Sequence, residues 1–285
     1  MKLYPYEIDE NIYQRFDQKN NMIYRPMWDR SLPTFRQMFF TNIEKHIESN
    51  KEGYTRLDFA FVKAAWTVYK KFPFAFAWKP DSFNLGDFYG TNWTKTKYEI
   101  EDIAEFTNKV KKAAEFYGAS LVGITDIDDK WIYKTGFNMA GLTSKQMSKG
   151  GIRAGEDDGS VLKTPIELPE GINKAIVMAI EMNPEAIATA PAQPAAAAAA
   201  NGYSKIAFSL SCMGEFIRNL GYRAIQCGND TALSVPFAID AGLGALGRIG
   251  LLITPEYGPR VRLAKIFTDL PLNSDEPNRD FIKKV

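Results

Sequence analysis

The feature that most constrains this chain of 285 residues is a helical period near its centre. Apolar residues recur there at spacings of four, three, four and three, at Ile206, Leu210, Met213, Ile217 and Leu220. This spacing puts them on one face of an α-helix, so residues 204–220 predict a long helix with one buried side. With 45% hydrophobic residues, the chain can bury that face in one large domain or two small ones.

Short apolar runs around this helix predict buried strands. They lie at residues 121–124, 175–180, 222–225 and 251–254, and a second helical pattern covers 101–117. Residues 143–172 are polar and rich in glycine, which predicts a loop. Because helix and strand signals alternate, we expect an α/β (α+β) fold.

Residues 1–100 look irregular and are rich in aromatic side chains, notably at 72–78 and 88–93. Such clusters are typical of core and loop packing. They are also compatible with an aromatic wall around an apolar pocket.

The segment from Pro184 to Asn201 leaves two interpretations open. Its prolines and its run from Ala195 to Ala200 are typical of a low-complexity linker. Alanine also has the highest helix propensity, and the periodic helix follows directly. We therefore favour a helix that begins in this segment.

Composition argues against several classes of function. The net charge is +1, so no overall field attracts nucleic acid, and we expect no nucleic-acid partner. Cys212 and Cys227 form no CxxC pair, and His46 is the only histidine, on a polar helix face that we expect at the surface. We therefore expect no metal site built from these side chains. No apolar run approaches the roughly 18 residues of a membrane helix, and the N-terminus lacks the pattern of an export signal.

A glycine motif near the C-terminus has two interpretations. Residues 242–247, Gly-Leu-Gly-Ala-Leu-Gly, match GxGxxG, which occurs in dinucleotide sites. That fingerprint must open a long helix, but a strand-like segment and Pro255 follow here. We therefore favour a tight turn whose backbone closely approaches another group and whose N–H groups can hold an anion such as a phosphate.

Several ordered motifs carry a family resemblance. They are Asn-Gly-Tyr-Ser at 201–204, Cys-Gly-Asn-Asp-Thr at 227–231, Leu-Ser-Val-Pro at 233–236, the glycine turn, Gly-Pro-Arg-Val-Arg at 258–262 and Phe-Thr-Asp-Leu-Pro at 267–271. Together they resemble the reductive dehalogenases and, more distantly, the epoxyqueuosine reductases, two families that bind a cobamide. The resemblance covers roughly residues 101–275. It implies a nitroreductase-like cobamide-binding core at 101–285 and an N-terminal region, 1–100, that contributes to the substrate pocket.

The resemblance implies that Tyr203, Asn229 and Arg262 form the active site. Reductive dehalogenation of a small organohalide consumes two electrons and one proton, and a corrinoid cofactor supplies the electrons. A tyrosine with the ordinary pKa near 10 holds its proton at neutral pH and can donate it. We assign proton donation to Tyr203, electrostatic support to Arg262 and orientation to Asn229. Each residue also has a structural interpretation, as a packing, turn or ion-pair residue. Arg260 competes with Arg262 for its role.

The resemblance also assigns cofactor contacts. We expect Ser234, Gly242, Gly244 and Gly247 to bind the corrinoid, whereas Asp230 and Ser234 alternatively shape the loop. The sequence lacks the Asp-x-His-x-x-Gly signature of proteins that ligate cobalt with histidine. We therefore expect no protein histidine on cobalt and no metal ligand from this chain.

The chain departs from the family pattern at both ends. Family members continue into a ferredoxin-like segment whose cysteines hold two [4Fe–4S] clusters, and they usually begin with a twin-arginine export signal. Neither is visible here, so we expect a fragment, with the clusters only in the full-length protein. For that protein the resemblance implies export, a peripheral place on the outer face of the cytoplasmic membrane, and a membrane anchor subunit and homodimer as further partners.

Two alternatives remain at this point. One is a tRNA-modifying epoxyqueuosine reductase, which would favour a basic surface. The other is a non-catalytic cobamide-binding protein, which the missing cluster cysteines support.

Overall fold

The computed structural model describes residues 7–29, 31–35, 43–71, 96–137 and 163–282. The aromatic segments at 72–78 and 88–93 and most of the predicted 143–172 loop lie outside these described residues.

A four-stranded sheet forms the centre of the fold, with the strand order β1-β4-β8-β5. Its strands are β1 (Leu121–Asp126), β4 (Lys174–Glu181), β8 (Val261–Thr268) and β5 (Ala224–Cys227). Every neighbouring pair is antiparallel, and Ile180 on β4 stands opposite Arg262 on β8. Helices packed on an antiparallel sheet make this an α+β fold, which confirms the expected class.

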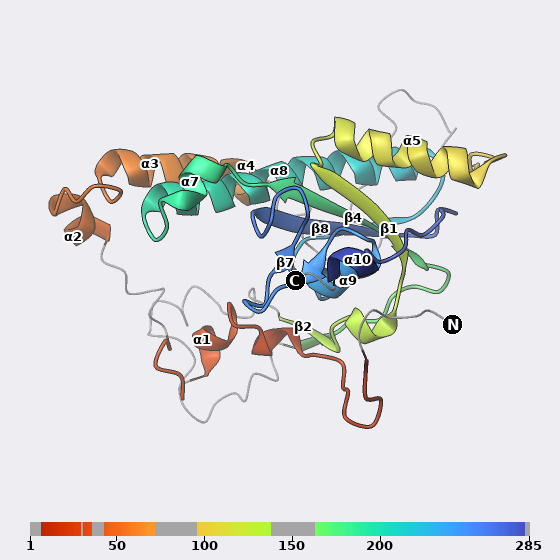
Figure 1. Ribbon diagram of the computed structural model, residues 1–285, viewed down its shortest axis with the longest axis horizontal. Helices are drawn as coiled ribbons and strands as arrows, with labels where there is room; N and C mark the ends of the chain where they lie inside the picture. The colour runs from red at the N-terminus through yellow and green to blue at the C-terminus, as the bar shows by residue number, and fades with distance from the viewer. Residues whose placement is uncertain (1–6, 30, 36–42, 72–95, 138–162, 283–285) are drawn as a thin grey trace.

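Helices cover both faces of this sheet. On one side lie α5 (Ile103–Phe116) and α8 (Gln193–Asn219), and on the other lies α9 (Ser234–Asp240) (Figure 1). Alternate residues of a strand face opposite sides, so β4 sends Ile176 and Met178 into the core under α8, and Ala175 and Val177 into the core under α9. Burial on both faces explains why β4 reads as a continuous apolar run.

Helix α8 is one continuous helix of 27 residues that includes the alanine run. The prediction of a helix rather than a linker is therefore confirmed. Pro194 lies in its first turn, where a missing N–H costs nothing. The predicted buried face is correct through Ile217, and Leu220 caps the C-terminal end.

The N-terminal part supplies short helices that reach the same side of the sheet as α8. Helices α3 (Arg56–Ala65) and α4 (Thr67–Lys71) run along α8, beside α7 (Pro184–Ala188) (Figure 1). Before them come η1 (Gln18–Asn20), α1 (Arg25–Trp28) and α2 (Ile43–Glu48). His46 on α2 is exposed and stacks on Tyr54, which confirms its expected surface position.

The remaining elements are small. They are η5 (Asp129–Trp131), the pair β2 (Thr135–Phe137) and β3 (Lys163–Pro165), the hairpin β6 (Ala245–Leu246) and β7 (Leu252–Ile253), and α10 (Arg279–Ile282). The loop prediction is wrong where β3 pairs with β2, because that pairing joins segments far apart in the sequence. No helix in the described part of the chain is long and apolar enough to cross a membrane.

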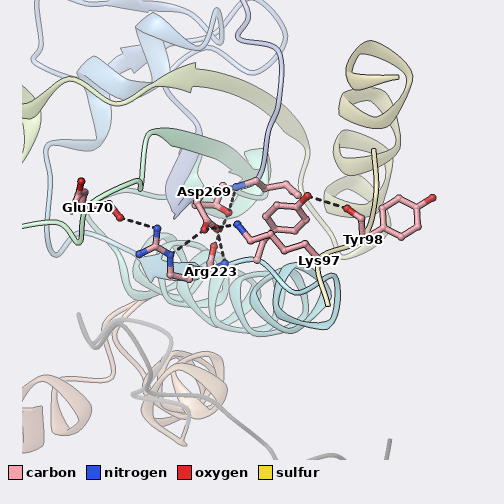
Figure 2. Close-up of polar contacts among 8 residues, drawn as sticks. Lys97, Tyr98, Glu170, Arg223 and Asp269 are labelled. Carbon is pink, nitrogen blue, oxygen red and sulfur yellow. Dashed lines mark hydrogen bonds and ion pairs between the residues drawn. The ribbon is translucent and has the colours of Figure 1, made fainter. Parts of the chain in front are cut away.

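A polar network joins the residue before β5 to the residue after β8 (Figure 2). The Asp269 carboxylate accepts hydrogen bonds from Arg223 N (2.7 Å), Arg223 Nε (3.1 Å) and Lys97 Nζ (3.3 Å). Burial alone would raise the pKa of Asp269, but these donors hold that pKa below its usual range. The network therefore ties the segment before α5 to the edge of the sheet.

Candidate active site

The structure brings together three side chains from distant parts of the sequence. Tyr203 lies on α8, Arg262 on β8, and Asn229 in the turn after β5. Asn229 Nδ2 donates to Tyr203 Oη at 2.7 Å, and Arg262 Cζ lies 5.1 Å from the centroid of the Tyr203 ring. These contacts follow from the fold, because α8 lies across β8 and β5 is the neighbour of β8. The predicted grouping of these three residues is present, and their chemical roles remain predictions.

Two hydrogen-bond donors at this site have no acceptor among the described residues. Tyr203 Oη accepts from Asn229, but its own hydrogen finds no acceptor among the described residues. Arg262 Nε is buried and makes no hydrogen bond with any of the described residues. Buried polar groups are normally paired, so Arg262 Nε is available to a ligand, and the half-buried Tyr203 hydroxyl can still donate its hydrogen.

Gly202 makes the close approach of Arg262 possible. A Cβ atom at this position would lie 2.9 Å from Arg262 Cγ, which is closer than two such carbons approach. This glycine belongs to the Asn-Gly-Tyr-Ser motif at 201–204, and no role was predicted for it. Only the packing of α8 on β8 shows that the residue before Tyr203 must be small.

The competing arginine is occupied elsewhere. Arg260 Nη1 pairs with Glu181 Oε1 at 2.8 Å and donates to Met182 O at 3.0 Å. Arg262 is therefore the arginine of the Gly-Pro-Arg-Val-Arg motif that lies over the Tyr203 ring.

Aromatic side chains from the N-terminal region pack on Tyr203. The Trp66 ring stacks on it with centroids 5.5 Å apart, and the Tyr69 ring meets it edge-on at 5.6 Å. Ser204 on α8 holds both in place, because its Oγ donates to Ala65 O (2.6 Å) and accepts from Tyr69 N (3.2 Å). The sequence did not predict the role of Ser204, since its partners lie more than 130 residues away.

Further phenols and one carboxylate surround this cluster. Burial raises the pKa of Tyr24 and of Tyr69 and raises that of Tyr133 to about 12, and the Asp230 charge adds to each shift. Burial also raises the pKa of Asp230 to about 6, although the Lys265 charge and hydrogen bonds from Thr231 and Gly228 oppose that rise. At neutral pH these phenols therefore keep their protons.

The residues predicted to bind a cofactor have clear structural roles. Ser234 Oγ bonds to Gly228 O and accepts from Lys265 Nζ, so it shapes the loop that carries Asn229. A Cβ on Gly244 would lie 2.1 Å from Ile253 O, and Gly242 has a φ of +77°.

A Cβ added at Gly247 would lie 2.7 Å from the Ile253 side chain, so the glycine turn approaches its own chain closely at this residue too. The turn opens the β6–β7 hairpin rather than a long helix, which confirms the expectation of a tight turn. Contact of these four residues with a cofactor remains a prediction.

Both cysteines are unsuited to reactive chemistry. Cys227 is fully buried and Cys212 is half-buried, and burial raises the pKa of both thiols. The described residues contain no group of three histidine, cysteine or carboxylate side chains that could hold a metal ion.

Comparison with known proteins gives one consistent result, although no family model matches the chain. The chain is 39% identical over 201 residues to tetrachloroethene reductive dehalogenase of Dehalobacter restrictus, covering 64% of this chain and 36% of the relative. With the protein of the same name from Sulfurospirillum multivorans it shares 39% identity over 188 residues, covering 63% of this chain and 37% of the relative. The resemblance to the reductive dehalogenases is therefore confirmed, and the chain spans a little over a third of the length of these relatives.

Solved structures agree on the fold. A catabolic reductive dehalogenase in complex with 3-bromo-4-hydroxybenzoic acid gives a TM-score of 0.58 at 19% identity, covering 97% of this chain and 34% of that chain. A second reductive dehalogenase, described for B12-dependent dehalogenation, gives 0.51 at 22% identity, covering 74% of this chain and 26% of that chain. At these identities the likeness concerns the fold alone.

Proposed function

We propose that this chain, a relative of the tetrachloroethene reductive dehalogenases, forms the part of a corrinoid-dependent enzyme that replaces a halogen of an organohalide by hydrogen. The observation that carries the proposal is the Tyr203 phenol. Its oxygen is oriented by Asn229, its ring lies beneath the Arg262 guanidinium, and its hydrogen is free among the described residues.

The proposed reaction requires one proton and two electrons. The carbon–halogen bond breaks and the halogen leaves as halide, while a carbon–hydrogen bond forms with the proton from Tyr203 Oη. The Asn229 amide holds that oxygen in one orientation, and the fixed charge of Arg262 stabilises the phenolate left behind. A proton from solvent then restores the phenol.

The residues present fit a corrinoid at this site. Arg262 Nε is buried without a partner and offers a donor to the cofactor, which leaves the phenol hydrogen of Tyr203 for the substrate. Ser234, Gly242, Gly244 and Gly247 are the residues that we expect to hold the cofactor, with no protein histidine on cobalt. When bound, a reduced corrinoid supplies the two electrons.

Trp66 and Tyr69 extend the proposal to the substrate. Their rings pack against Tyr203, so an apolar molecule that reaches the phenol meets aromatic surface from the N-terminal region. This arrangement supports residues 1–100 as a contributor to the substrate pocket and a small chlorinated or brominated hydrocarbon as the substrate.

The remaining features of the whole protein are proposals from the resemblance alone. They are two [4Fe–4S] clusters as electron donors, export to the outer face of the cytoplasmic membrane, a membrane anchor subunit and a homodimer. The curated relatives favour dehalogenation over a tRNA-modifying or a purely binding role.

The test replaces Tyr203 by Phe in the whole protein reconstituted with a corrinoid. This change keeps the ring against Trp66 and Arg262 and removes the donor, so halide release should fall at least about 100-fold. Tyr222→Phe is the matched control, because the Tyr222 hydroxyl donates to Tyr98 O (3.0 Å) within the core. Normal halide release by Tyr203→Phe, with the corrinoid bound, would refute Tyr203 as the donor.

A further inference from the structure

A fully buried lysine lies beneath the loop that carries Asn229. Lys265 on β8 is 0% exposed, and its Nζ donates to Gly228 O at 2.6 Å and to Ser234 Oγ at 3.1 Å. Asp230 O lies 3.5 Å from the same nitrogen. All of these acceptors belong to residues 228–234. A buried ammonium group is costly unless its hydrogen bonds are met, so the lysine and the loop fix each other.

This loop has a strained backbone. Thr231 has a φ of +67°, a left-handed conformation that β-branched residues rarely adopt. Such a conformation persists only where the surrounding structure determines it. The Asp230 carboxylate accepts from Gly228 N (2.8 Å) and from Thr231 Oγ1 (3.0 Å), and Lys265 adds the bond to the Gly228 carbonyl.

The Gly228 carbonyl is part of the planar peptide group that leads into Asn229. The hydrogen bond from Lys265 to this oxygen therefore fixes the direction in which the chain continues from β5 into Asn229. Asn229 Nδ2 then reaches Tyr203 Oη at 2.7 Å. Lys265 itself faces the α9 side of the sheet, because it alternates with Ala264 and Ile266, which belong to the core under α8.

We propose that Lys265 is a positioning residue that acts through Gly228 and Asn229 to hold the amide against the Tyr203 phenol. The inference rests on the proposed function for its kinetic consequence, while the ordering of the loop is a property of the chain itself. Burial lowers the pKa of Lys265, and the nearby Asp230 carboxylate opposes that shift because it favours the charged ammonium group.

The experiment compares Lys265→Met with Arg218→Met in the whole protein. Methionine keeps the length of the lysine stem and removes the ammonium group. Arg218 is the matched control, because it is a partly buried cation that bonds to β5, at Ala224 O (3.1 Å) and Gln226 Oε1 (2.9 Å), but not to residues 228–234.

The first readout is amide hydrogen exchange, which requires no catalysis. We expect Lys265→Met to increase exchange in residues 228–234 and Arg218→Met to leave that segment unchanged. Where Lys265→Met prevents folding, Lys265→Gln is measured in its place, since its amide is too short to meet both Gly228 O and Ser234 Oγ. Unchanged exchange in 228–234 for the folded Lys265 variant would overturn the inference.

The second readout is kcat for halide release in a double-mutant cycle with Asn229→Ala. We expect Lys265→Met to lower kcat about 10- to 100-fold, the effect of a misplaced catalytic group. It should lower kcat no further once Asn229 is already Ala, because Lys265 acts through Asn229. Additive losses would indicate a general structural role. Absent halide release by the unmodified, loaded protein would instead refute the proposed function, and the exchange result would still decide the role of Lys265.

Discussion

Replacing Gly202 by Ala tests how the packing of α8 on β8 controls the candidate active site. The added Cβ would lie 2.9 Å from Arg262 Cγ, 3.6 Å from Arg262 Cβ and 3.7 Å from Met182 Cγ. The first distance is too short for two carbons. Because Cγ is near the backbone, Arg262 cannot relieve the contact by moving its tip alone, and the whole side chain must move from its place over the Tyr203 ring.

Two opposing terms set the effect on stability. Alanine in a helix interior is favoured over glycine by about 1 kcal/mol. Overpacking a close contact costs about 1–3 kcal/mol. The free energy of unfolding should therefore fall by no more than about 2 kcal/mol, which leaves most proteins folded. Activity should fall much further, by about 10- to 100-fold, because the guanidinium no longer lies over the phenol.

Gly214→Ala is the control for this prediction. It makes the same exchange on the same helix, but its Cβ would meet Gln226 Nε2 at 2.3 Å and Arg218 Nη1 at 3.1 Å instead of Arg262. Halide release and urea unfolding are measured for both variants. If Gly202→Ala retained full halide release, or lost activity only in proportion to its stability as Gly214→Ala does, the geometric argument would fail.

Two further predictions concern Ser204, beside the site, and Asp269, at the edge of the sheet. Ser204→Ala leaves Ala65 O and Tyr69 N without their partner, so the free energy of urea unfolding should fall by about 1–3 kcal/mol. The KM for the organohalide should rise because Trp66 and Tyr69 lose their anchor, and an unchanged KM would show that these two rings do not contribute to substrate binding. Asp269→Asn should lower the free energy of unfolding at pH 7 by about 1–3 kcal/mol. Since the pKa of Asp269 is lowered in the folded state, its contribution to stability is present above the unfolded pKa near 3.9 and is lost as the pH falls through the folded pKa. The difference in free energy of unfolding between Asp269→Asn and the unmodified protein should therefore shrink below about pH 4, and a constant difference would contradict this assignment.

Much of the fold could be predicted because its signals are local. The helical period at 204–220 and the apolar run at 175–180 depend on neighbouring residues, and both elements formed where expected. Strand β8 was not predicted as a strand, because Arg262 and Lys265 interrupt its apolar pattern. These same two residues contact the candidate active site and the loop at 228–234.

The grouping of Tyr203, Asn229 and Arg262 came from matching ordered motifs, since separations of 26 residues or more say nothing about contact by themselves. The supports could not be predicted in this way. Gly202, Ser204 and Lys265 act through partners on other elements, and such contacts appear only once the strands are in register.

The register of β8 links the two halves of the site. Side chains three positions apart on a strand point to opposite faces, so Arg262 points toward α8 and Lys265 toward α9. The first cation lies over the phenol ring, and the second holds the loop that orients the phenol oxygen from the other side of the sheet. A shift of one residue in the pairing of β8 with β4 would exchange these faces and remove both contacts at once. The long antiparallel pairing of β4 with β8, which places Ile180 opposite Arg262, is therefore the structural condition for the proposed chemistry.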